Sequence, residues 1–380
     1  MSALSEAFAK NFAYGREVGA SVSVFDANGE VESLHGGFCD AARTAPWGPE
    51  TLVLIWSATK GLAVACALHA MEKCGVDIDA RVGELWPEFA QAGKDHLTFA
   101  HLLSHRAGLC ALDSKSATFL DHESVIRAVE AQVPLRGIDD SPAYGPRVFG
   151  FVLDEIVRRL SGGETLGSYW RRVFAEPLDL DIWIGLPEEF HPRVATILSP
   201  RVQPGATHDA FALAFADNTS LTRRAFSCPA GSPSPSAMNS PRMRSASLPS
   251  LGGIGSAPAL AKFYAMLANG GRNGSSEIFG EKSFHWMTSR LAQGFDGVLL
   301  METAYSAGFM LDPIDAAGRK IRQLLGPSVS AFGHAGAGGS LAFADPEKKI
   351  GFAYVMNQME LGVLPNDRCL ALVDAFYSQS

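Results

Sequence analysis

Segments with strand-like patterns stand at both ends of this 380-residue chain, and helix-like segments fill its middle. Near the start, residues 20–25 alternate in polarity, a turn follows at 26–29, and residues 31–39 can return as a second strand. Near the end, residues 341–344 and 350–356 flank a second turn in the same way. A sheet built from both ends makes the intervening helices an insertion. We therefore expect an α+β protein, with an antiparallel sheet flanked by helices and a helical lobe beside it.

The length of the chain predicts two lobes, because one hydrophobic core rarely grows to this size. We expect residues 1–88 and 245–380 to form a discontinuous α/β lobe, and residues 89–244 to form the mainly helical lobe. The clearest helical periodicity covers residues 149–160. The Ser/Pro-rich segment 228–249 has a composition that buries little, and we interpret it either as a disordered surface loop or as a lid over a substrate.

Composition excludes several classes of partner. Hydrophobic residues make up 47% and charged residues 19%, which is typical of a compact folded protein. The net charge of −8 and the absence of a Lys/Arg-rich run argue against nucleic-acid binding. We find neither a signal peptide nor an apolar run long enough to span a bilayer, so we expect a cytoplasmic protein without a membrane partner.

The six scattered cysteines are interpreted as free thiols, and nothing in the sequence predicts an oligomeric state.

One short stretch has the features of a nucleophile site. The β-branched run 51–55 leads into Trp56-Ser57-Ala58-Thr59-Lys60-Gly61, and residues 62–71 continue as an Ala/Leu-rich helix. Residues three apart share a helix face, so the Lys60 amine can reach the Ser57 hydroxyl. A helix N-terminus adds unpaired N–H groups and a partial positive charge. Ser-x-x-Lys alone is a weak pattern, and its plain alternative is a helix-capping serine followed by a solvated lysine. Together these features make Ser57 a candidate nucleophile with Lys60 as its base.

A nucleophile of this kind needs three further parts: a second proton-handling group, an oxyanion hole and a wall that places the substrate. Tyr144, just before the helix at 149–160, is a candidate for the first part, although by itself it could be a packing residue. The glycine-rich segment 331–340, which contains His334, is a candidate for the other two.

These three motifs follow one another as they do in a known superfamily. Ser57-Ala-Thr-Lys60, Tyr144 and His334-Ala-Gly336 resemble, in type and order, the motifs of serine β-lactamases and penicillin-binding proteins. The resemblance is closest to class C β-lactamases and family VIII carboxylesterases, and segments 102–109 and 333–357 extend it over most of the chain. It implies a β-lactamase/transpeptidase-like fold, with the site in the cleft between the lobes and with no cofactor.

The resemblance also implies catalytic roles. Ser57 would attack a carbonyl and form an acyl-enzyme. Lys60 would take or relay the serine proton, with its pKa lowered by partial desolvation. Tyr144 would carry the proton to the leaving group and later activate water. Whether Lys60 or Tyr144 is the general base stays open for such sites. The backbone N–H groups of Ser57 and Ala337 would form the oxyanion hole.

Three further residues are expected around the substrate. His334 stands where β-lactamases usually carry lysine, and Gly336 would let the strand approach the substrate closely. Asn357 would either face the substrate or have a structural role at the end of its strand.

Two departures from the family pattern bear on the substrate. The Tyr-x-Asn motif is Tyr144-Gly-Pro146 here, so the Asn side chain that would hold the lysine and a substrate amide is missing. The Lys-Thr-Gly motif is His334-Ala-Gly336, so a titratable group replaces a fixed cation. Both favour simple esters, and we expect a serine carboxylesterase whose partner is a small, short-chain acyl ester. The alternatives are a β-lactamase or D-amino-acid amidase with the same nucleophile, and a non-catalytic binding protein on this scaffold.

Other motifs in the sequence give weaker evidence about function. His101 and His105 have a spacing that suits zinc, but no Glu lies between them and no third ligand is evident, so we expect no metal site. The chain has no Gly-x-Ser-x-Gly elbow for a Ser-His-Asp hydrolase. Trp56, Trp183 and Phe332 are interpreted either as the lining of an acyl pocket or as core residues.

Overall fold

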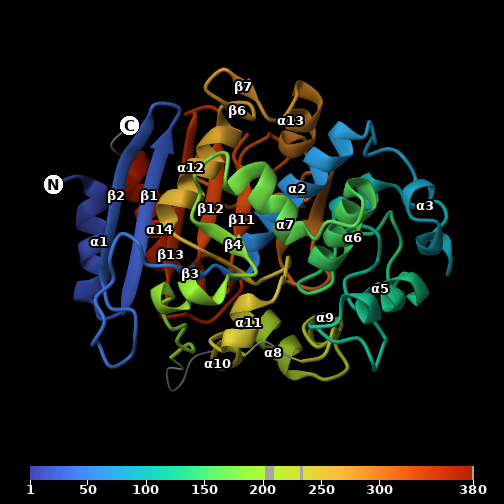
Figure 1. Cartoon of the computed structure of the whole chain (residues 1–380), viewed down its shortest axis with the longest axis horizontal. Helices are drawn as coiled ribbons and strands as arrows, with labels where there is room; N and C mark the ends of the chain where they lie inside the picture. Colours follow the sequence, from blue (N-terminus) through green and yellow to red (C-terminus); the bar gives the residue numbers. More distant parts are fainter. Residues whose placement is uncertain (202–208, 232–233, 379–380) are drawn as a thin grey trace.

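The computed structural model describes residues 1–201, 209–231 and 234–378, and its main element is an eight-stranded antiparallel sheet (Figure 1). The predicted assembly of this sheet from both ends of the chain is confirmed, because β1 pairs with β2 on one side and with β13 on the other. In sheet order the strands are β2 (Gly29–Gly37), β1 (Gly19–Asp26), β13 (Ile350–Met356), β12 (Leu341–Asp345), β11 (Phe332–Ala335), β10 (Met310–Leu311), β9 (Glu302–Tyr305) and β8 (Ala292–Phe295).

Helices cover both faces of the sheet. Helix α12 (Ala257–Ala268) packs so closely on β13 that a Cβ on Gly351 would lie 2.1 Å from the Ala261 carbonyl oxygen. The next residue of the strand points to the opposite face, where the Phe352 ring lies 6.5 Å from that of Phe376 in α14 (Asp367–Tyr377). Helix α1 (Ala3–Ala13) packs against α14 and β2. The covered faces explain why β11, β12 and β13 are buried along their whole length.

Helix α2 (Thr59–Lys73) connects the sheet to the helical part of the molecule. Thirteen of its fifteen residues are buried, because it lies between β11 on one side and helices α6 (Phe149–Ser161) and α7 (Leu166–Trp170) on the other. A helix that is apolar on all sides needs such surroundings. The first turn of α2 therefore places the predicted nucleophile between the two parts of the chain.

The remaining elements are short. A three-stranded sheet in the order β3 (Val53–Leu54), β5 (Gly253–Gly255) and β4 (Ile182–Ile184) supports the start of α2. It joins strands from both predicted lobes, whose boundaries stay a prediction. The other elements are α3 (Val82–Leu85), α4 (Phe99–Leu103), α5 (His122–Ala131), α8 (Ala210–Ala216), α9 (Leu221–Ala225), α10 (Pro235–Met238), α11 (Pro241–Ser245), α13 (Glu281–Thr288), and the hairpin β6 (Arg272–Asn273) and β7 (Ser276–Glu277).

The Ser/Pro-rich segment 228–249 contains two helices, apart from residues 232–233, which lie outside the described residues. The side chains of Ser234 and Ser240 cap helices α10 and α11, and in each the following proline occupies the first turn. Met238 and Met243 are buried. The pairs Ser234-Pro235 and Ser240-Pro241 are thus helix starts, and a lid function for this segment stays a prediction.

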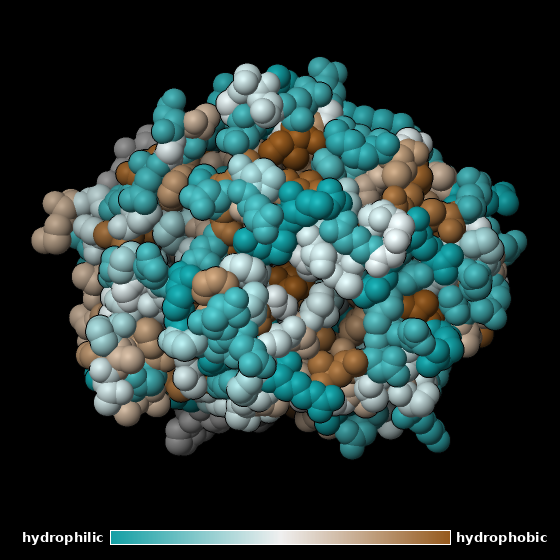
Figure 2. Space-filling view, in the orientation of Figure 1, coloured by the Kyte–Doolittle hydropathy of each residue, from teal (hydrophilic) through white to brown (hydrophobic). Residues whose placement is uncertain are grey.

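The outer surface is mixed in polarity. On the face shown in Figure 2, hydrophilic side chains surround small apolar areas. Over residues 1–201, 209–231 and 234–378, no helix combines the length and hydropathy needed to cross a bilayer. All six cysteines are free thiols, as predicted.

Candidate active site

A strained turn presents Ser57 between β3 and α2. Trp56 has a φ of 50°, a left-handed conformation that is rare for a bulky side chain and that is found where a site demands it. The Thr59 hydroxyl donates to the Trp56 carbonyl and accepts from the Gly253 N–H at 2.8 Å. The N–H of Ile55 bonds to the Gly253 carbonyl at 2.9 Å. Hydrogen bonds to Gly253 of strand β5 therefore fix the turn, and Ser57 stays partly exposed.

The Lys60 amine is fully buried and contacts three oxygens. Nζ lies 3.1 Å from Ser57 Oγ, 2.9 Å from the Pro146 carbonyl and 2.7 Å from the Ser250 carbonyl. Burial lowers the pKa of Lys60 well below its usual range. In the described part of the chain no carboxylate forms an ion pair with this amine, so nothing raises its pKa again.

The partners of Lys60 determine what its nitrogen can do. Carbonyl oxygens only accept, so the Pro146 and Ser250 carbonyls each take an N–H from Lys60. A neutral amine has two N–H groups and one lone pair, and the lone pair is then left for the Ser57 hydroxyl. The missing Asn of the family motif therefore does not leave the lysine without support, because the backbone carbonyl of Pro146 holds it.

Tyr144 lies beside both Ser57 and Lys60. Its hydroxyl hydrogen-bonds to Ser57, and its ring centroid is 5.0 Å from Lys60 Nζ. Burial raises the pKa of Tyr144, so the phenol keeps its proton through the neutral range. The three residues predicted to act together are thus side by side.

Two residues that sequence reasoning missed support this arrangement. The buried carboxylate of Asp296 accepts from the Tyr144 N–H, with both oxygens at 3.2 Å, and from the Tyr305 hydroxyl at 3.2 Å. The Ser250 hydroxyl donates to the Arg147 carbonyl at 2.6 Å and so places its own carbonyl on Lys60. No sequence signal distinguishes either residue from an ordinary turn residue.

The end of strand β11 lies against the nucleophile turn. A Cβ on Gly336 would be 2.2 Å from Ser340 Oγ and 2.3 Å from the Ile55 carbonyl oxygen, so only glycine fits. The N–H groups of Ser57 and Ala337 donate no backbone hydrogen bond to any residue that the structure describes. Both residues are partly exposed, so these donors are free for a substrate oxygen, although their role as an oxyanion hole stays a prediction.

His334 is a neutral ring at the rear of the site. Its ring centroid lies 6.0 Å from that of Tyr144, and its Nδ1 lies 2.7 Å from the Ala335 carbonyl oxygen. Because a carbonyl accepts, Nδ1 carries the hydrogen and Nε2 presents a lone pair. Burial and the nearby Lys60 lower the pKa of His334 to about 3. The family's lysine is therefore replaced by an uncharged group, not by the titratable cation that we expected.

Asn357 is buried at the end of β13, with both ends of its amide in use. Its Oδ1 accepts from the Gly19 N–H at 2.9 Å, and its Nδ2 donates to the Phe38 carbonyl at 3.0 Å. This geometry favours the structural alternative over a contact with substrate.

The two histidines with zinc-like spacing have separate roles. His101 forms a capping box with Thr98 at the start of α4. The His105 Nδ1 accepts from the Gly145 N–H at 3.3 Å, and its ring packs 5.1 Å from that of Tyr144. Within the described ranges, no group of three or more His, Cys, Asp or Glu side chains is placed to hold a metal ion.

The three aromatic candidates for an acyl pocket lie apart. Trp56 is buried in the nucleophile turn. The Trp183 ring packs with Phe190 and under Arg171, and Phe332 packs on Phe309 within the core. Trp56 alone is adjacent to Ser57 in the chain, and the pocket-lining role of all three stays a prediction.

Comparison with known proteins agrees with this geometry. The Beta-lactamase family model matches residues 5–373. "Esterase/beta-lactamase LipL" of Mycobacterium tuberculosis is 30% identical over 359 residues, which cover 93% of this chain and 80% of that protein. A penicillin-binding protein homolog from Caulobacter crescentus has 34% identity and a TM-score of 0.88, covering 100% of this chain and 97% of the other. A family VIII carboxylesterase has 33% identity and a TM-score of 0.86, covering 99% and 96%.

The expected β-lactamase/transpeptidase fold is therefore confirmed. The chain belongs to the Beta-lactamase family, and its similarity to esterases supports a hydrolase.

Proposed function

We propose that the protein is a serine carboxylesterase that cleaves short-chain acyl esters through an acyl-enzyme on Ser57. One observation carries the proposal: the buried Lys60 amine gives its N–H groups to two carbonyls and lies 3.1 Å from Ser57 Oγ. A lone pair directed at a hydroxyl is the arrangement that a general base requires. The similarity to proteins named as esterases supports the choice of reaction.

Acylation follows from these contacts. Ser57 gives its proton to Lys60 as Oγ forms a bond to the ester carbonyl carbon, and the N–H groups of Ser57 and Ala337 stabilise the oxyanion. The carbon–oxygen bond to the alcohol then breaks. Tyr144, which has kept its proton, donates it to the departing alkoxide and recovers a proton from the Lys60 ammonium. Lys60 is thus the base and Tyr144 the proton carrier.

Deacylation reverses the proton path. Water loses a proton to the Tyr144–Lys60 pair as its oxygen bonds to the acyl carbon, and Ser57 Oγ leaves with that proton. The products are a carboxylic acid and the free enzyme. Every proton moved in the two steps is thus accounted for by the substrate, water and these three side chains.

His334 favours esters over β-lactams. The ring is neutral and its N–H is committed to the Ala335 carbonyl, so it offers neither a cation nor a donor to a substrate carboxylate. We therefore expect faster turnover of p-nitrophenyl esters than of a chromogenic cephalosporin. The opposite order would instead support the β-lactamase or amidase alternative with the same nucleophile.

A single-turnover experiment tests the nucleophile. Wild type and Ser57→Ala are mixed with p-nitrophenyl butyrate, quenched and examined by mass spectrometry. We expect a burst of p-nitrophenol and one butyryl group on Ser57 in the wild type, with neither in the variant. Equal slow release from both proteins without an adduct would overturn the proposal in favour of a non-catalytic binding protein.

A further inference from the structure

The turn that carries Ala337 is bonded to a distant segment of the chain, residues 358–366, which follows β13. The Gly338 N–H donates to the Gly362 carbonyl at 3.2 Å, and the Glu360 N–H donates to the Gly338 carbonyl at 3.1 Å. Asn366 adds a side-chain bond, because its Nδ2 donates to the same Gly338 carbonyl at 3.3 Å. The position of the Ala337 N–H therefore depends on that segment as well as on β11.

The packing between the two segments leaves no free space. A Cβ on Gly338 would lie 2.7 Å from the Met359 side chain, and a Cβ on Gly339 would lie 2.7 Å from Asn366 Nδ2. Both glycines also have positive φ angles, of 83° and 122°. A shift of segment 358–366 would thus move the turn with it.

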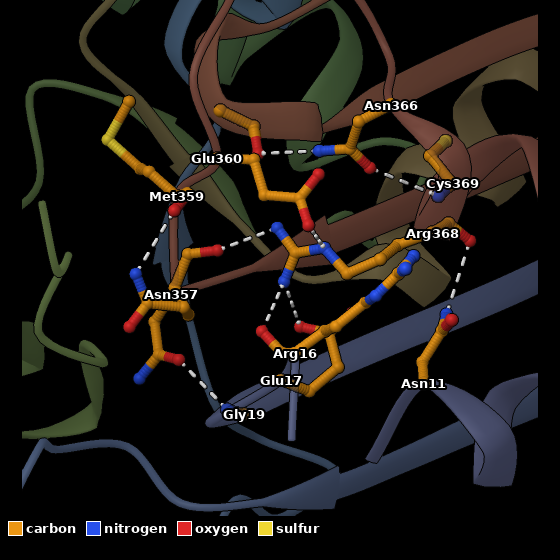
Figure 3. A network of polar contacts seen from close by, with 12 residues as sticks. Asn11, Arg16, Glu17, Gly19, Asn357, Met359, Glu360, Asn366, Arg368 and Cys369 are labelled. Carbon is orange, nitrogen blue, oxygen red and sulfur yellow. Dashed lines mark hydrogen bonds and ion pairs between the residues drawn. The ribbon is translucent and has the colours of Figure 1, made fainter. Parts of the chain in front are cut away.

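A buried guanidinium anchors segment 358–366 from beneath (Figure 3). Arg368 donates through Nη2 to the Gln358 carbonyl at 2.9 Å, and its Nε forms a 2.9 Å ion pair with Glu360. On the opposite side of the guanidinium, Nη1 bonds to Glu17 at 2.8 Å. Arg368 and Glu17 are fully buried, whereas the side chain of Glu360 is 33% exposed. Glu360 is therefore the member of this network that can be changed with the least damage to the core.

We propose that Glu360 and Asn366 are positioning residues of the oxyanion hole, which hold the Ala337 turn in register with Ser57. The inference rests on the proposed function. An oxyanion donor works only when it is fixed where negative charge develops, and a supporting shell that is slightly loose leaves the donor present but misplaced. Both residues act through the Ala337 turn, so their effect should fall on the chemical step and leave substrate binding almost unchanged.

The variants separate positioning from folding. Glu360→Ala removes the contact with Arg368, whereas Glu360→Gln removes the charge and keeps a side chain of the same shape with an oxygen beside Nε. In the native protein, Asn366 Oδ1 caps α14 by accepting from the Cys369 N–H, and Nδ2 donates to Gly338. Asn366→Ser supplies a hydroxyl that can still cap the helix, but it removes the Nδ2 donor to Gly338. Glu188→Ala, on an exposed turn, is the matched control.

Single-turnover acylation by p-nitrophenyl butyrate gives the first readout. We expect the maximal rate to fall about tenfold in Glu360→Ala and Asn366→Ser, a part of the roughly 10²–10³-fold effect of losing a whole donor. The half-saturating concentration should stay within about twofold, Glu360→Gln should retain most of the rate, and Glu188→Ala should match the wild type.

The thiono analogue of the ester, with C=S in place of C=O, gives the second readout. Sulfur accepts hydrogen bonds weakly, so the ratio of oxo-ester to thiono-ester acylation reports on the oxyanion donors. We expect this ratio to fall in Glu360→Ala and Asn366→Ser. A wild-type ratio in both variants, with or without a lower melting temperature, would overturn the inference. If the wild type itself forms no Ser57 adduct, the proposed function has failed instead.

Discussion

Lys60 and Arg368 are both basic side chains with no solvent exposure, and their partners differ in kind. Lys60 contacts a hydroxyl and two backbone carbonyls, and burial lowers its pKa. Burial alone would lower the pKa of Arg368 too, but Tyr354, Glu17 and Glu360 raise it. With only neutral acceptors around it, Lys60 can lose its proton, whereas the guanidinium of Arg368 is always charged and is stabilised by its carboxylate partners. The comparison teaches that a buried lysine without carboxylate partners is suited to proton transfer, whereas a buried arginine paired with carboxylates is suited to holding segments of the chain together.

The largest expected effect is the loss of acylation in Lys60→Met. Without a base for Ser57, single-turnover acylation by p-nitrophenyl butyrate should fall by about 10³-fold or more. The matched control is Lys94→Met, because Lys94 is also buried and donates to two carbonyls, of Glu130 and Gln132, away from the site. That variant should acylate at the wild-type rate. A Lys60→Met protein that keeps a tenth of the wild-type rate would contradict the role of Lys60 as base.

An effect on stability, and not on the chemical step, is expected from Arg368→Met. Removing the cation leaves Glu17 buried without compensation, which should cost about 3–5 kcal/mol of unfolding free energy, measured with urea near pH 8. Burial raises the pKa of Glu17, so lowering the pH protonates this carboxylate and removes the unpaired buried charge. The difference in unfolding free energy between the wild type and Arg368→Met should therefore shrink as the pH falls toward 5.

The control for that measurement is an exposed pair. Arg319→Met breaks the contact of Arg319 with Asp315 and should leave the unfolding free energy almost unchanged, because solvent screens this exposed pair. Equal losses in the two variants would show that burial adds nothing to the Arg368 pair, and the comparison with Lys60 would then fail.

Local signals in the sequence predicted much of the fold. The helix expected at residues 149–160 spans Phe149–Ser161. The first hairpin also lies where the turn at 26–29 placed it. Such features succeed because a cap, a turn and a periodic face are all set by neighbouring residues.

The site was predictable only where its parts are close in sequence or have a distinctive type. Ser57 and Lys60 share one helical turn, so their spacing predicted their contact. The other partners of Lys60 are backbone carbonyls 86 and 190 residues further along the chain. Every residue has a backbone carbonyl, so the residue types of Pro146 and Ser250 do not predict that their carbonyls contact Lys60. The lowered pKa of His334 likewise results from burial, and the His-Ala-Gly motif does not show whether the side chain is buried.

The pH dependence of wild-type acylation tests the central claim most directly, with the slow release by Ser57→Ala subtracted. Only neutral Lys60 can accept the serine proton, and burial lowers its pKa, so the amine loses its proton well below pH 10.5. The acylation rate should therefore rise on a limb that ends well below pH 10.5 and be level above it while Tyr144 is still protonated. A rate that keeps rising toward pH 10 would show a lysine of ordinary pKa and contradict the account.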